Sequence, residues 1–408
     1  MEPPSSSPPA VPGAGAGCVG PGEGSGLDEK DEGPPEVSEQ LAPIRDKLAR
    51  GARLAREDGL KLYACPDLLS VGLLANWSAR RRHGRRTFYV RNGHLNYSNY
   101  CVLSCAFCAF RRARGPHERA GGYELSPEQV FEAAGRIAAT GATEVHVVGG
   151  LHPSLPFSYY LELLRGLRQR HPRLGRKCFS ASEVLHLARV ARLSPGDTLA
   201  ALREAGLDTL PGGGAEVLDD QLRARLCPGK ETSAAWLDLH RQAHRLGIRS
   251  NSTMLHGHVE SAEQRVAHLL KLRELQDETG GFLAHVPLSY HPGGNRMGLA
   301  HGPSGVAELR EHAVARLMLD NFPHVKVYWV TTGLPVAQLA LHFGASDLDG
   351  TVLHEEVHRA AGADAPRSVA PGELCRLIRE AGREAVERDH LYRRVVRGDR
   401  GPLDWRVE

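Results

Sequence analysis

Three cysteines lie between positions 101 and 108 of the chain. Cys101, Cys105 and Cys108 are separated by three and then two residues, in the run CVLSCAFC. Thiolates are the preferred ligands of iron–sulfur clusters, and an ordinary four-iron cluster takes four cysteines. No fourth cysteine lies nearby, because the next ones along the chain are Cys65 and Cys178. The loop therefore predicts a four-iron cluster in which one iron keeps an open coordination site, as catalytic metal centres do.

A zinc site is the alternative reading of these cysteines. Zinc sites usually show paired Cys-x-x-Cys or Cys/His ligands in two halves. His94 lies seven residues before the first cysteine, which is awkward spacing for a fourth ligand in the same loop. The spacing therefore favours the cluster.

Composition limits the classes of protein to which the chain can belong. With 408 residues, of which 41% are hydrophobic, it is long enough for one large core domain plus extensions. A net charge of +3 gives no strong attraction to nucleic acid or to a membrane. The one basic run, RRRHGRR at 80–86, indicates a solvated connector rather than a nucleic-acid patch.

The sequence also indicates the cell compartment in which we expect the protein. No stretch approaches 18 apolar residues, and the N-terminus has neither the basic start nor the apolar segment of a signal peptide. Cluster ligands must stay as thiolates, which fits a reducing compartment. We therefore expect a cytoplasmic protein without a membrane span.

The chain divides into four segments. Residues 1–37 are rich in Pro, Gly, Ser and Glu, which predicts a disordered tail. Residues 38–86 show helical spacing of apolar side chains and predict an N-terminal helical segment. From 87 to 350 strand and helix patterns alternate at least six times, and residues 351–408 are expected to form a helical extension with a terminal helix near 371–388.

The alternating region indicates an α/β fold. A strand over 88–90 is expected to lead through 94–96 into the cysteine loop, and further strands are expected at 145–148, 177–180, 207–210, 249–255, 282–287 and 324–330. Helices are expected between them, at about 126–140, 157–170, 219–226, 232–246, 261–278 and 304–320. Polar or glycine residues follow nearly every strand, and in a (β/α) barrel the active site lies at those ends. We therefore predict a (β/α) barrel, partial or complete, rather than an open doubly wound sheet.

The cysteine spacing, with Phe107 before the last cysteine, resembles the signature of the radical S-adenosylmethionine (SAM) superfamily. The resemblance implies a [4Fe-4S] cluster whose open iron is chelated by SAM, and one electron from the cluster that cleaves SAM. Gly149 and Gly150 resemble the family's glycine motif, which receives the methionine amino group of SAM, although a plain turn is the alternative. Ser180 and Glu183 lie where the family often places a polar contact to SAM, although Glu183 also suits the first turn of a helix.

Two later stretches complete the predicted site. The run TMLHGHVE at 253–260 resembles the family's GxIxGxxE strand, which shapes the adenine pocket and here offers Thr253, Leu255 and Gly257. It departs from the pattern by having Thr253 for the first glycine and Leu255 for isoleucine. Glu216, in the turn GGGAE, and His258 are the predicted catalytic residues, with Glu216 binding a ligand hydroxyl or transferring a proton.

Longer runs over about residues 50–390 resemble the aminofutalosine synthase (aminodeoxyfutalosine synthase) family. They include CAFCAFRR, AGLDTLPGGGAEVL, NSTMLHGHVES and RLMLDNFPHVKVYWV. The sequence departs from that family at Tyr97-Ser98, where Pro-Thr is expected, and at His256, where Tyr is expected.

The resemblance implies a radical SAM transferase that consumes SAM as a co-substrate. The 5′-deoxyadenosyl radical of SAM adds to the enol ether of 3-[(1-carboxyvinyl)oxy]benzoate. Rearrangement and decarboxylation give 6-amino-6-deoxyfutalosine, L-methionine and bicarbonate, in menaquinone biosynthesis. The implied partners are this benzoate and an electron donor such as flavodoxin or ferredoxin. Arg111 and Arg296 are candidate partners for the substrate's two carboxylates.

Three other functions remain open. The nearest is that of the cyclic dehypoxanthine futalosine synthase family, which shares much of the resemblance but abstracts hydrogen and releases 5′-deoxyadenosine. An iron–sulfur or zinc RNA-binding module is disfavoured by the near-neutral charge and by the lack of an RNA-binding motif. A plain electron carrier would need a fourth cysteine at the cluster.

Overall fold

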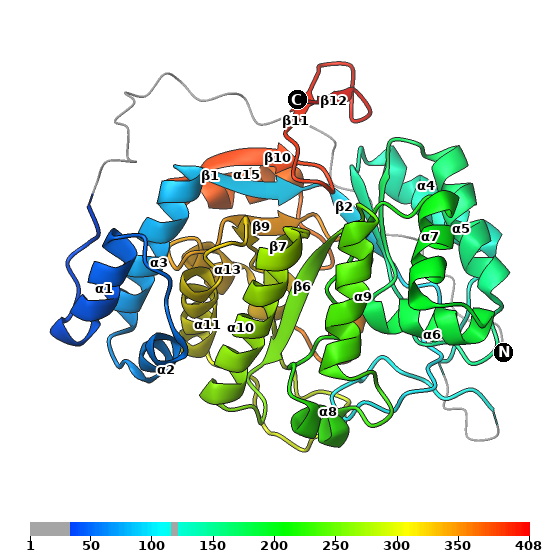
Figure 1. Cartoon of the computed structure of the whole chain (residues 1–408). Helices are drawn as coiled ribbons and strands as arrows, with labels where there is room; N and C mark the ends of the chain where they lie inside the picture. The colour runs from blue at the N-terminus through cyan, green and yellow to red at the C-terminus, as the bar shows by residue number, and fades with distance from the viewer. Residues whose placement is uncertain (1–32, 116–120) are drawn as a thin grey trace.

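A computed structural model describes residues 33–115 and 121–408 of the chain (Figure 1). The predicted disordered tail at 1–37 therefore falls almost wholly outside the described residues, which begin at Gly33.

The N-terminal helical segment is confirmed. It consists of η2 (Glu39–Leu41), α1 (Ala42–Ala49), α2 (Arg56–Ala64) and α3 (Leu68–His83). Asp67 caps α3 by accepting a hydrogen bond from the Ser70 amide at 3.0 Å. α2 and α3 pack against α10 and α11 of the barrel, at the left of Figure 1, and Leu41 and Ile44 are buried in the hydrophobic core.

A sheet of parallel strands forms the centre of the molecule, and its strands follow one another in chain order. The strands are β2 (Asn92–Leu95), β3 (Glu144–Val147), β4 (Gly175–Cys178), β5 (Thr209–Leu210), β6 (Arg249–His256), β7 (Phe282–Ser289) and β8 (His324–Val325). The helices between them are α4 (Pro127–Ala139), α5 (Phe157–Arg170), α6 (Ala181–Ala191), α7 (Pro195–Ala205), α8 (Asp220–Leu226), α9 (Ser233–Arg245), α10 (Ala262–Thr279) and α11 (Gly305–Met318). Parallel strands joined by helical crossovers confirm the predicted α/β class.

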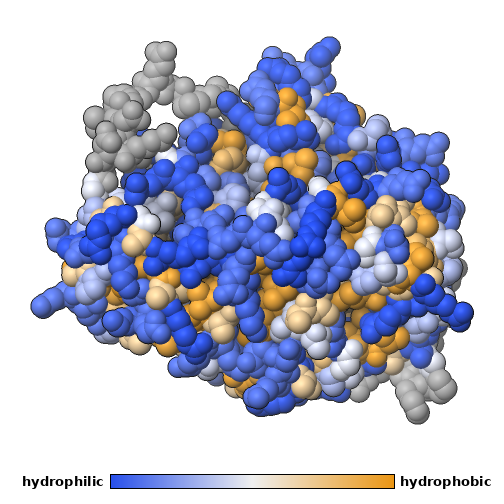
Figure 2. Space-filling view, viewed as in Figure 1, coloured by the Kyte–Doolittle hydropathy of each residue, from blue (hydrophilic) through white to orange (hydrophobic). Residues whose placement is uncertain are grey.

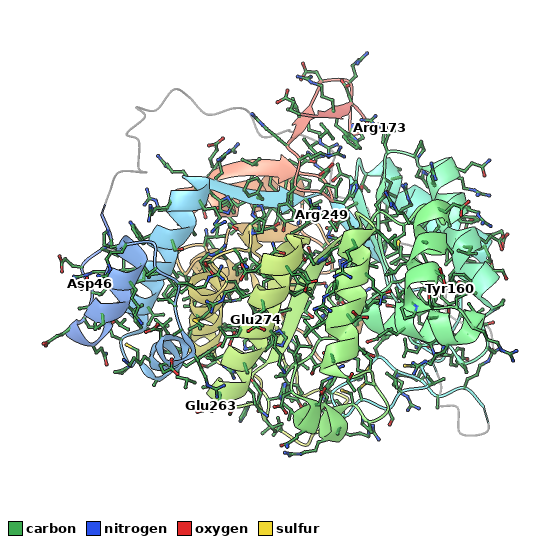
Figure 3. The ribbon with its side chains drawn as sticks, viewed as in Figure 1. Asp46, Tyr160, Arg173, Arg249, Glu263 and Glu274 are labelled. Carbon is green, nitrogen blue, oxygen red and sulfur yellow. The ribbon has the colours of Figure 1, made fainter. Side chains whose placement is uncertain are left out.

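Side chains of these strands alternate between the helices and the interior of the barrel. Gly93 faces α4, because a Cβ added there would lie 2.6 Å from Ile137. Its neighbours Asn92 and His94 therefore point to the interior. Figure 3 shows the helix side of the sheet, where Tyr160 lies among the helices that follow β3 and β4.

A second sheet of three parallel strands, in the order β10–β1–β9, lies beside the first. It consists of β1 (Arg86–Val90), β9 (Asp347–Gly350) and β10 (Glu384–Arg388). The segment 346–353 also bonds to both edges of the main sheet. The Ser346 amide donates to the Val325 carbonyl at 2.9 Å, and the His94 amide donates to the Leu353 carbonyl at 2.6 Å. The edges of the seven-stranded sheet are thus bridged by this segment.

Three predicted elements were wrong. The strand expected to lead from 88 into the cysteine loop is two strands, β1 and β2, in different sheets. The strand predicted over 324–330 ends at Val325, and Trp329–Thr332 is helix α12. The terminal helix predicted over 371–388 ends at Glu380 as α15 (Pro371–Glu380), because Gly382 adopts a φ of +69° and β10 then pairs with β1.

The C-terminal extension therefore mixes strands with helices. Besides α15 and β10, it contains α14 (Val357–Ala360), β11 (Val395–Arg397) and β12 (Trp405–Val407), and α13 (Leu334–Ala340) precedes it. The outer faces of the helices seen in Figure 2 are mainly hydrophilic. Within the part of the chain that the structure describes, no helix is long and apolar enough to span a membrane.

Candidate active site

The three predicted cluster ligands lie on the loop that follows β2, at the carboxyl end of the sheet. Backbone hydrogen bonds fix this loop to two others at the same end. The Val102 amide donates to the Leu151 carbonyl at 2.9 Å, and the Ala106 amide donates to the Leu226 carbonyl at 2.6 Å. The loop is thus anchored to the segment after β3 and to the end of α8, as a barrel active site requires.

The cysteine side chains pack together in a small hydrophobic cluster with Leu103 and Leu151. Burial raises the pKa of Cys108 to about 11, and the nearby thiols of Cys105 and Cys101 raise it as well. Three thiolates this close repel one another in an apolar setting, so an iron cluster would supply the missing positive charge.

Among residues 33–115 and 121–408, no three His, Cys, Asp or Glu side chains surround a single-ion site. A four-iron cluster binds one cysteine per iron, so its ligands need not converge on one point. Cys101, Cys105 and Cys108 therefore remain the predicted cluster ligands.

Two residues that sequence reasoning had not placed at the site lie against the cysteine loop. The Cys227 thiol is buried and forms a hydrogen bond with the Cys105 thiol, which lowers the pKa of Cys105 to about 7. The Lys230 ammonium is buried 5.9 Å from the ring centroid of Phe107. No local pattern in the sequence predicts that either residue contacts the cysteine loop. Both lie in a turn more than a hundred residues after that loop.

The predicted catalytic residues Glu216 and His258 lie close together, and both already have protein partners. Glu216 adopts a φ of +47° and its carboxylate is paired with Lys230. Burial acts to raise the pKa of Glu216, but the Lys230 ammonium more than offsets it, so the carboxyl is ionised. His258 Nδ1 lies 3.0 Å from Glu260 Oε2, and its Nε2 lies 3.1 Å from the Leu255 carbonyl. Their roles in proton transfer stay predictions.

The glycine pair after β3 is required by the protein's own packing. A Cβ on Gly149 would lie 2.6 Å from the Tyr97 ring, and one on Gly150 would overlap the Tyr100 carbonyl. The predicted contact between this backbone and SAM remains open. What the structure shows is that only glycine lets the loop after β3 approach the loop after β2.

Ser180 and Glu183 form the capping box at the start of α6. One Glu183 oxygen accepts from the Ser180 amide and hydroxyl, each at 2.7 Å. The other accepts from the Tyr97 hydroxyl at 2.9 Å and from the Gly149 amide at 3.0 Å. Burial raises the pKa of Glu183 to about 7. Glu183 therefore fixes the backbone of the glycine pair through its hydrogen bond with the Gly149 amide. Its contact with SAM stays a prediction.

The run resembling GxIxGxxE ends in a tight turn. The Thr253 hydroxyl donates to the Gly212 carbonyl at 2.7 Å, and the Leu255 amide donates to the Glu216 carbonyl at 2.9 Å. Gly257 has a φ of +84°, and its amide donates to Glu260 Oε1 at 2.6 Å. The first two bonds join the turn after β5 to β6, and the third closes the turn after β6, where the adenine pocket is predicted.

Three of the buried polar atoms that lack a hydrogen-bond partner among the described residues lie on β6 or in the segments after β8 and β9. They are Asn251 Oδ1, the Tyr328 hydroxyl and Glu355 Oε2, called here the unpartnered set. The Tyr328 ring is stacked on His94, with centroids 6.1 Å apart, and His94 lies 4.5 Å from His146. Burial lowers the pKa of both histidines, so the imidazoles are neutral hydrogen-bonding groups. Unsatisfied buried polar atoms are expected where a polar ligand binds.

A second group of buried side chains forms ion pairs, although Arg388 keeps one guanidinium nitrogen without a hydrogen bond among the described residues. Lys177 pairs with Glu144 at 2.7 Å, Lys326 with Asp349 at 3.0 Å, and Arg388 with Asp347 at 2.7 Å. We call these six residues the paired network. Glu144 and Asp347 begin β3 and β9, and Lys177 lies in register with His146, so the network extends from the amino ends of these strands to the level of His146.

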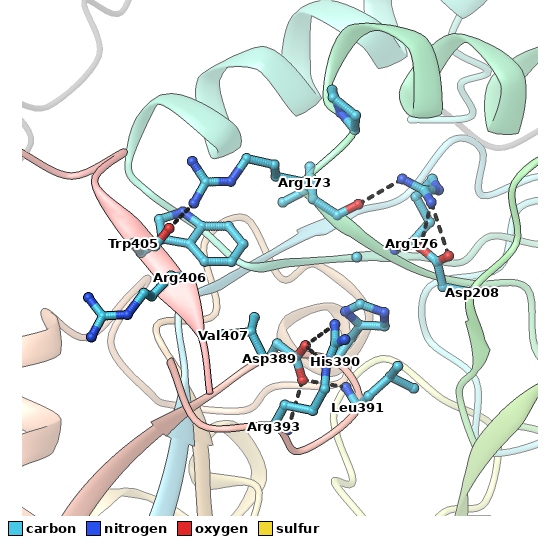
Figure 4. A pocket seen from close by; sticks show the side chains of 13 residues that line it. Arg173, Arg176, Asp208, Asp389, His390, Leu391, Arg393, Trp405, Arg406 and Val407 are labelled. Atoms are coloured by element: carbon cyan, nitrogen blue, oxygen red, sulfur yellow. Dashed lines mark hydrogen bonds and ion pairs between the residues drawn. The ribbon is translucent and has the colours of Figure 1, made fainter. Parts of the chain in front are cut away.

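A cavity of about 590 Å³ also lies at the amino end of the sheet, between β4 and the C-terminal hairpin (Figure 4). Its arginines are already engaged. Arg176 pairs with Asp208 at 2.8 Å and Arg393 pairs with Asp389 at 2.6 Å. Arg173, which Figure 3 shows beside this hairpin, donates to carbonyls there and stacks on Trp405 at 4.0 Å. The cavity faces away from the cysteines, so we do not assign it to the active site.

Family models and known relatives agree with this site. Residues 95–272 match the radical SAM superfamily, and residues 279–397 match the CofH/MqnC C-terminal region. The chain is 42% identical to the aminodeoxyfutalosine synthase of Thermus thermophilus, over 88% of this chain and 97% of the relative. This chain is a radical SAM protein of the CofH/MqnC family.

Other relatives carry different names within the same superfamily. The cyclic dehypoxanthine futalosine synthase of Streptomyces coelicolor is 36% identical, over 90% of this chain and 92% of that protein. Among solved structures, methylornithine synthase (PylB) has a TM-score of 0.67 at 19% identity, covering 83% of this chain and 96% of that chain, which supports the fold alone. Membership of the radical SAM superfamily implies a [4Fe-4S] cluster and SAM, which fits the three thiols.

Proposed function

We propose that this radical SAM protein is an aminodeoxyfutalosine synthase. The observation that carries the proposal is its 42% identity to the Thermus thermophilus enzyme of that name over nearly the whole length of both chains. The enzyme of that name from Streptomyces coelicolor is 39% identical, over 88% of this chain and 95% of the relative. The reaction joins the deoxyadenosyl part of SAM to 3-[(1-carboxyvinyl)oxy]benzoate and releases methionine and bicarbonate.

The thiolates of Cys101, Cys105 and Cys108 would hold the four-iron cluster, which supplies one electron for the cleavage of SAM. The turns of Gly149-Gly150 and of Thr253 to Gly257 would receive SAM. The unpartnered set would bind the benzoate substrate, because its polar atoms are already desolvated and lack protein partners. Neutral His94 and His146 would add donors for its carboxylates, and the enclosed interior would keep water from the reacting carbon.

Analysis of the products tests this function. The protein is reconstituted with iron and sulfide without oxygen, and is then given a reductant, SAM and the benzoate. We expect a nucleoside with the mass of 6-amino-6-deoxyfutalosine and one methionine per nucleoside formed. A Cys105→Ser variant, treated in the same way, is the control and should form neither. Release of 5′-deoxyadenosine without this nucleoside would reject the proposed substrate.

The second candidate is cyclic dehypoxanthine futalosine synthase, favoured by the 36% identical relative that matches over 92% of its length. It predicts no new adduct with the benzoate. With dehypoxanthine futalosine as substrate, this second function predicts release of 5′-deoxyadenosine. It also predicts a product that contains no part of SAM. The same mass spectra therefore distinguish the two candidates.

A further inference from the structure

The cysteine loop reaches the surface of the molecule. Val102, next to the first cysteine, is 51% exposed, and Cys101 and Cys108 are only half-buried. The proposed function, on which this inference rests, requires an electron to enter at these cysteines. The exposed side chain of Val102 therefore lies next to a predicted cluster ligand in the sequence.

Three arginines surround this part of the loop. Arg111 Nε donates to the Cys101 carbonyl at 3.2 Å. The Arg296 amide donates to the Ala106 carbonyl at 2.7 Å, and its guanidinium bonds the Ser104 carbonyl. Arg225 is exposed on α8, one residue before Leu226, whose carbonyl bonds the loop.

Unlike Arg114 and Arg223, these arginines have no carboxylate partner among the described residues. Arg114 pairs with Glu124 at 3.0 Å, and buried Arg223 pairs with Glu231 at 3.3 Å. Arg111, Arg225 and Arg296 take part in no such pair. Since the whole chain carries a net charge of only +3, this unneutralised group is a local excess of positive charge.

We propose that Val102, Arg111, Arg225 and Arg296 form a docking patch for an acidic one-electron carrier protein. The exposed Val102 supplies an apolar centre and the arginines supply a cationic rim, as in interfaces steered by complementary charge.

In the electron-transfer step the carrier is oxidised by one electron and the cluster is reduced by one electron. No bond is made or broken and no proton moves. Arg111 and Arg296 thus belong to this outer surface, rather than to the predicted carboxylate contacts.

Rates of cluster reduction test the patch. The reconstituted full chain is mixed with flavodoxin hydroquinone, an acidic carrier, or with reduced methyl viologen, a small cation. Arg225→Glu should slow reduction by flavodoxin by about tenfold at about 20 mM salt and should leave reduction by viologen within about twofold. Raising salt to about 200 mM should slow the unchanged protein with flavodoxin and largely remove the difference between the two proteins.

Arg50→Glu is the matched control, because it makes the same charge change on an exposed residue that ends α1. In Figure 1, α1 lies at the left end of the molecule and α8 at the bottom centre. Equal slowing by Arg50→Glu and Arg225→Glu would overturn the patch, and so would equal slowing of both electron donors. Neither measurement includes the benzoate, so a wrong substrate changes the product analysis above and leaves these rates unaffected.

Discussion

Two groups of buried polar side chains in the barrel differ in whether they have protein partners. The paired network matches each charge with a partner, as Arg388 with Asp347 at 2.7 Å. On β6 and in the segments after β8 and β9, the unpartnered set leaves polar atoms of Asn251, Tyr328 and Glu355 without bonds. Satisfied networks stabilise a fold, and unsatisfied groups reduce stability unless a ligand completes them. The comparison therefore assigns structure to one group and binding to the other.

The largest expected effect is at the cysteine loop. Serine at position 101, 105 or 108 should remove the cluster and abolish cleavage of SAM, because each thiolate is expected to bind one iron. Iron content and the amount of 5′-deoxyadenosine or adduct formed are the measurements. Cys178→Ala on β4 is the control, and it should keep its iron because its thiol lies outside the cysteine cluster.

Cys227→Ala sharpens this first prediction, since the Cys227 thiol touches that of Cys105. We expect its iron content to match that of the unchanged protein. Loss of iron in Cys227→Ala, with Cys178→Ala intact, would make Cys227 a fourth ligand and would argue against an open iron.

The next effect concerns the paired network. Asp347→Asn removes the nearer of the two carboxylates that pair with the fully buried Arg388, the other being Glu144 at 3.6 Å, and should lower the free energy of unfolding by about 3–5 kcal/mol. Urea unfolding of the variant measures the loss. Asp277→Asn breaks an ion pair with Arg53 at the surface, and it should cost less than about 1 kcal/mol. Equal losses in the two variants would contradict the assignment of the network to stability.

Sequence alone predicted the catalytic end better than the structural one. The cysteine spacing and the glycines after the strands are local patterns, so the elements that carry them were found within a few residues. The paired network depends on β9 and β10, which join the sheet through pairing with β1 across almost 300 residues. Residues 384–388 were predicted as helix because nothing local reveals that pairing. Lys230 was missed for the same reason, since it reaches Phe107 only in the folded chain.

A smaller effect should depend on pH and on Glu183. The pKa of this carboxyl is about 7 in the folded chain and about 4.5 in the unfolded chain, so the folded state binds more protons between these values. Its contribution to stability is present below pH 4.5 and is lost as the pH rises through 7. The difference amounts to about 3 kcal/mol. Urea unfolding at about pH 5 and pH 8 measures it.

Glu183→Gln supplies the control for that measurement, because the amide does not titrate. Its stability should change less between the two pH values than that of the unchanged protein. An identical pH dependence in both proteins would show that other groups cause it and that the bracing of Gly149 is independent of ionisation.

The smallest expected effect tests the unpartnered set by comparing two tyrosines. The Tyr328 hydroxyl has no partner, whereas the Tyr159 hydroxyl donates to the Leu125 carbonyl at 2.7 Å on the helix side of the sheet. Tyr328→Phe should lower kcat/KM for the benzoate by up to about tenfold, the value of one neutral hydrogen bond to a ligand, while changing stability by less than about 0.5 kcal/mol. Tyr159→Phe should do the reverse, with stability lower by about 1 kcal/mol and kcat/KM retained. If Tyr328→Phe instead lost stability and kept its kcat/KM, the hydroxyl would have a structural partner. The division between a binding group and a structural group of buried side chains would then fail at that residue.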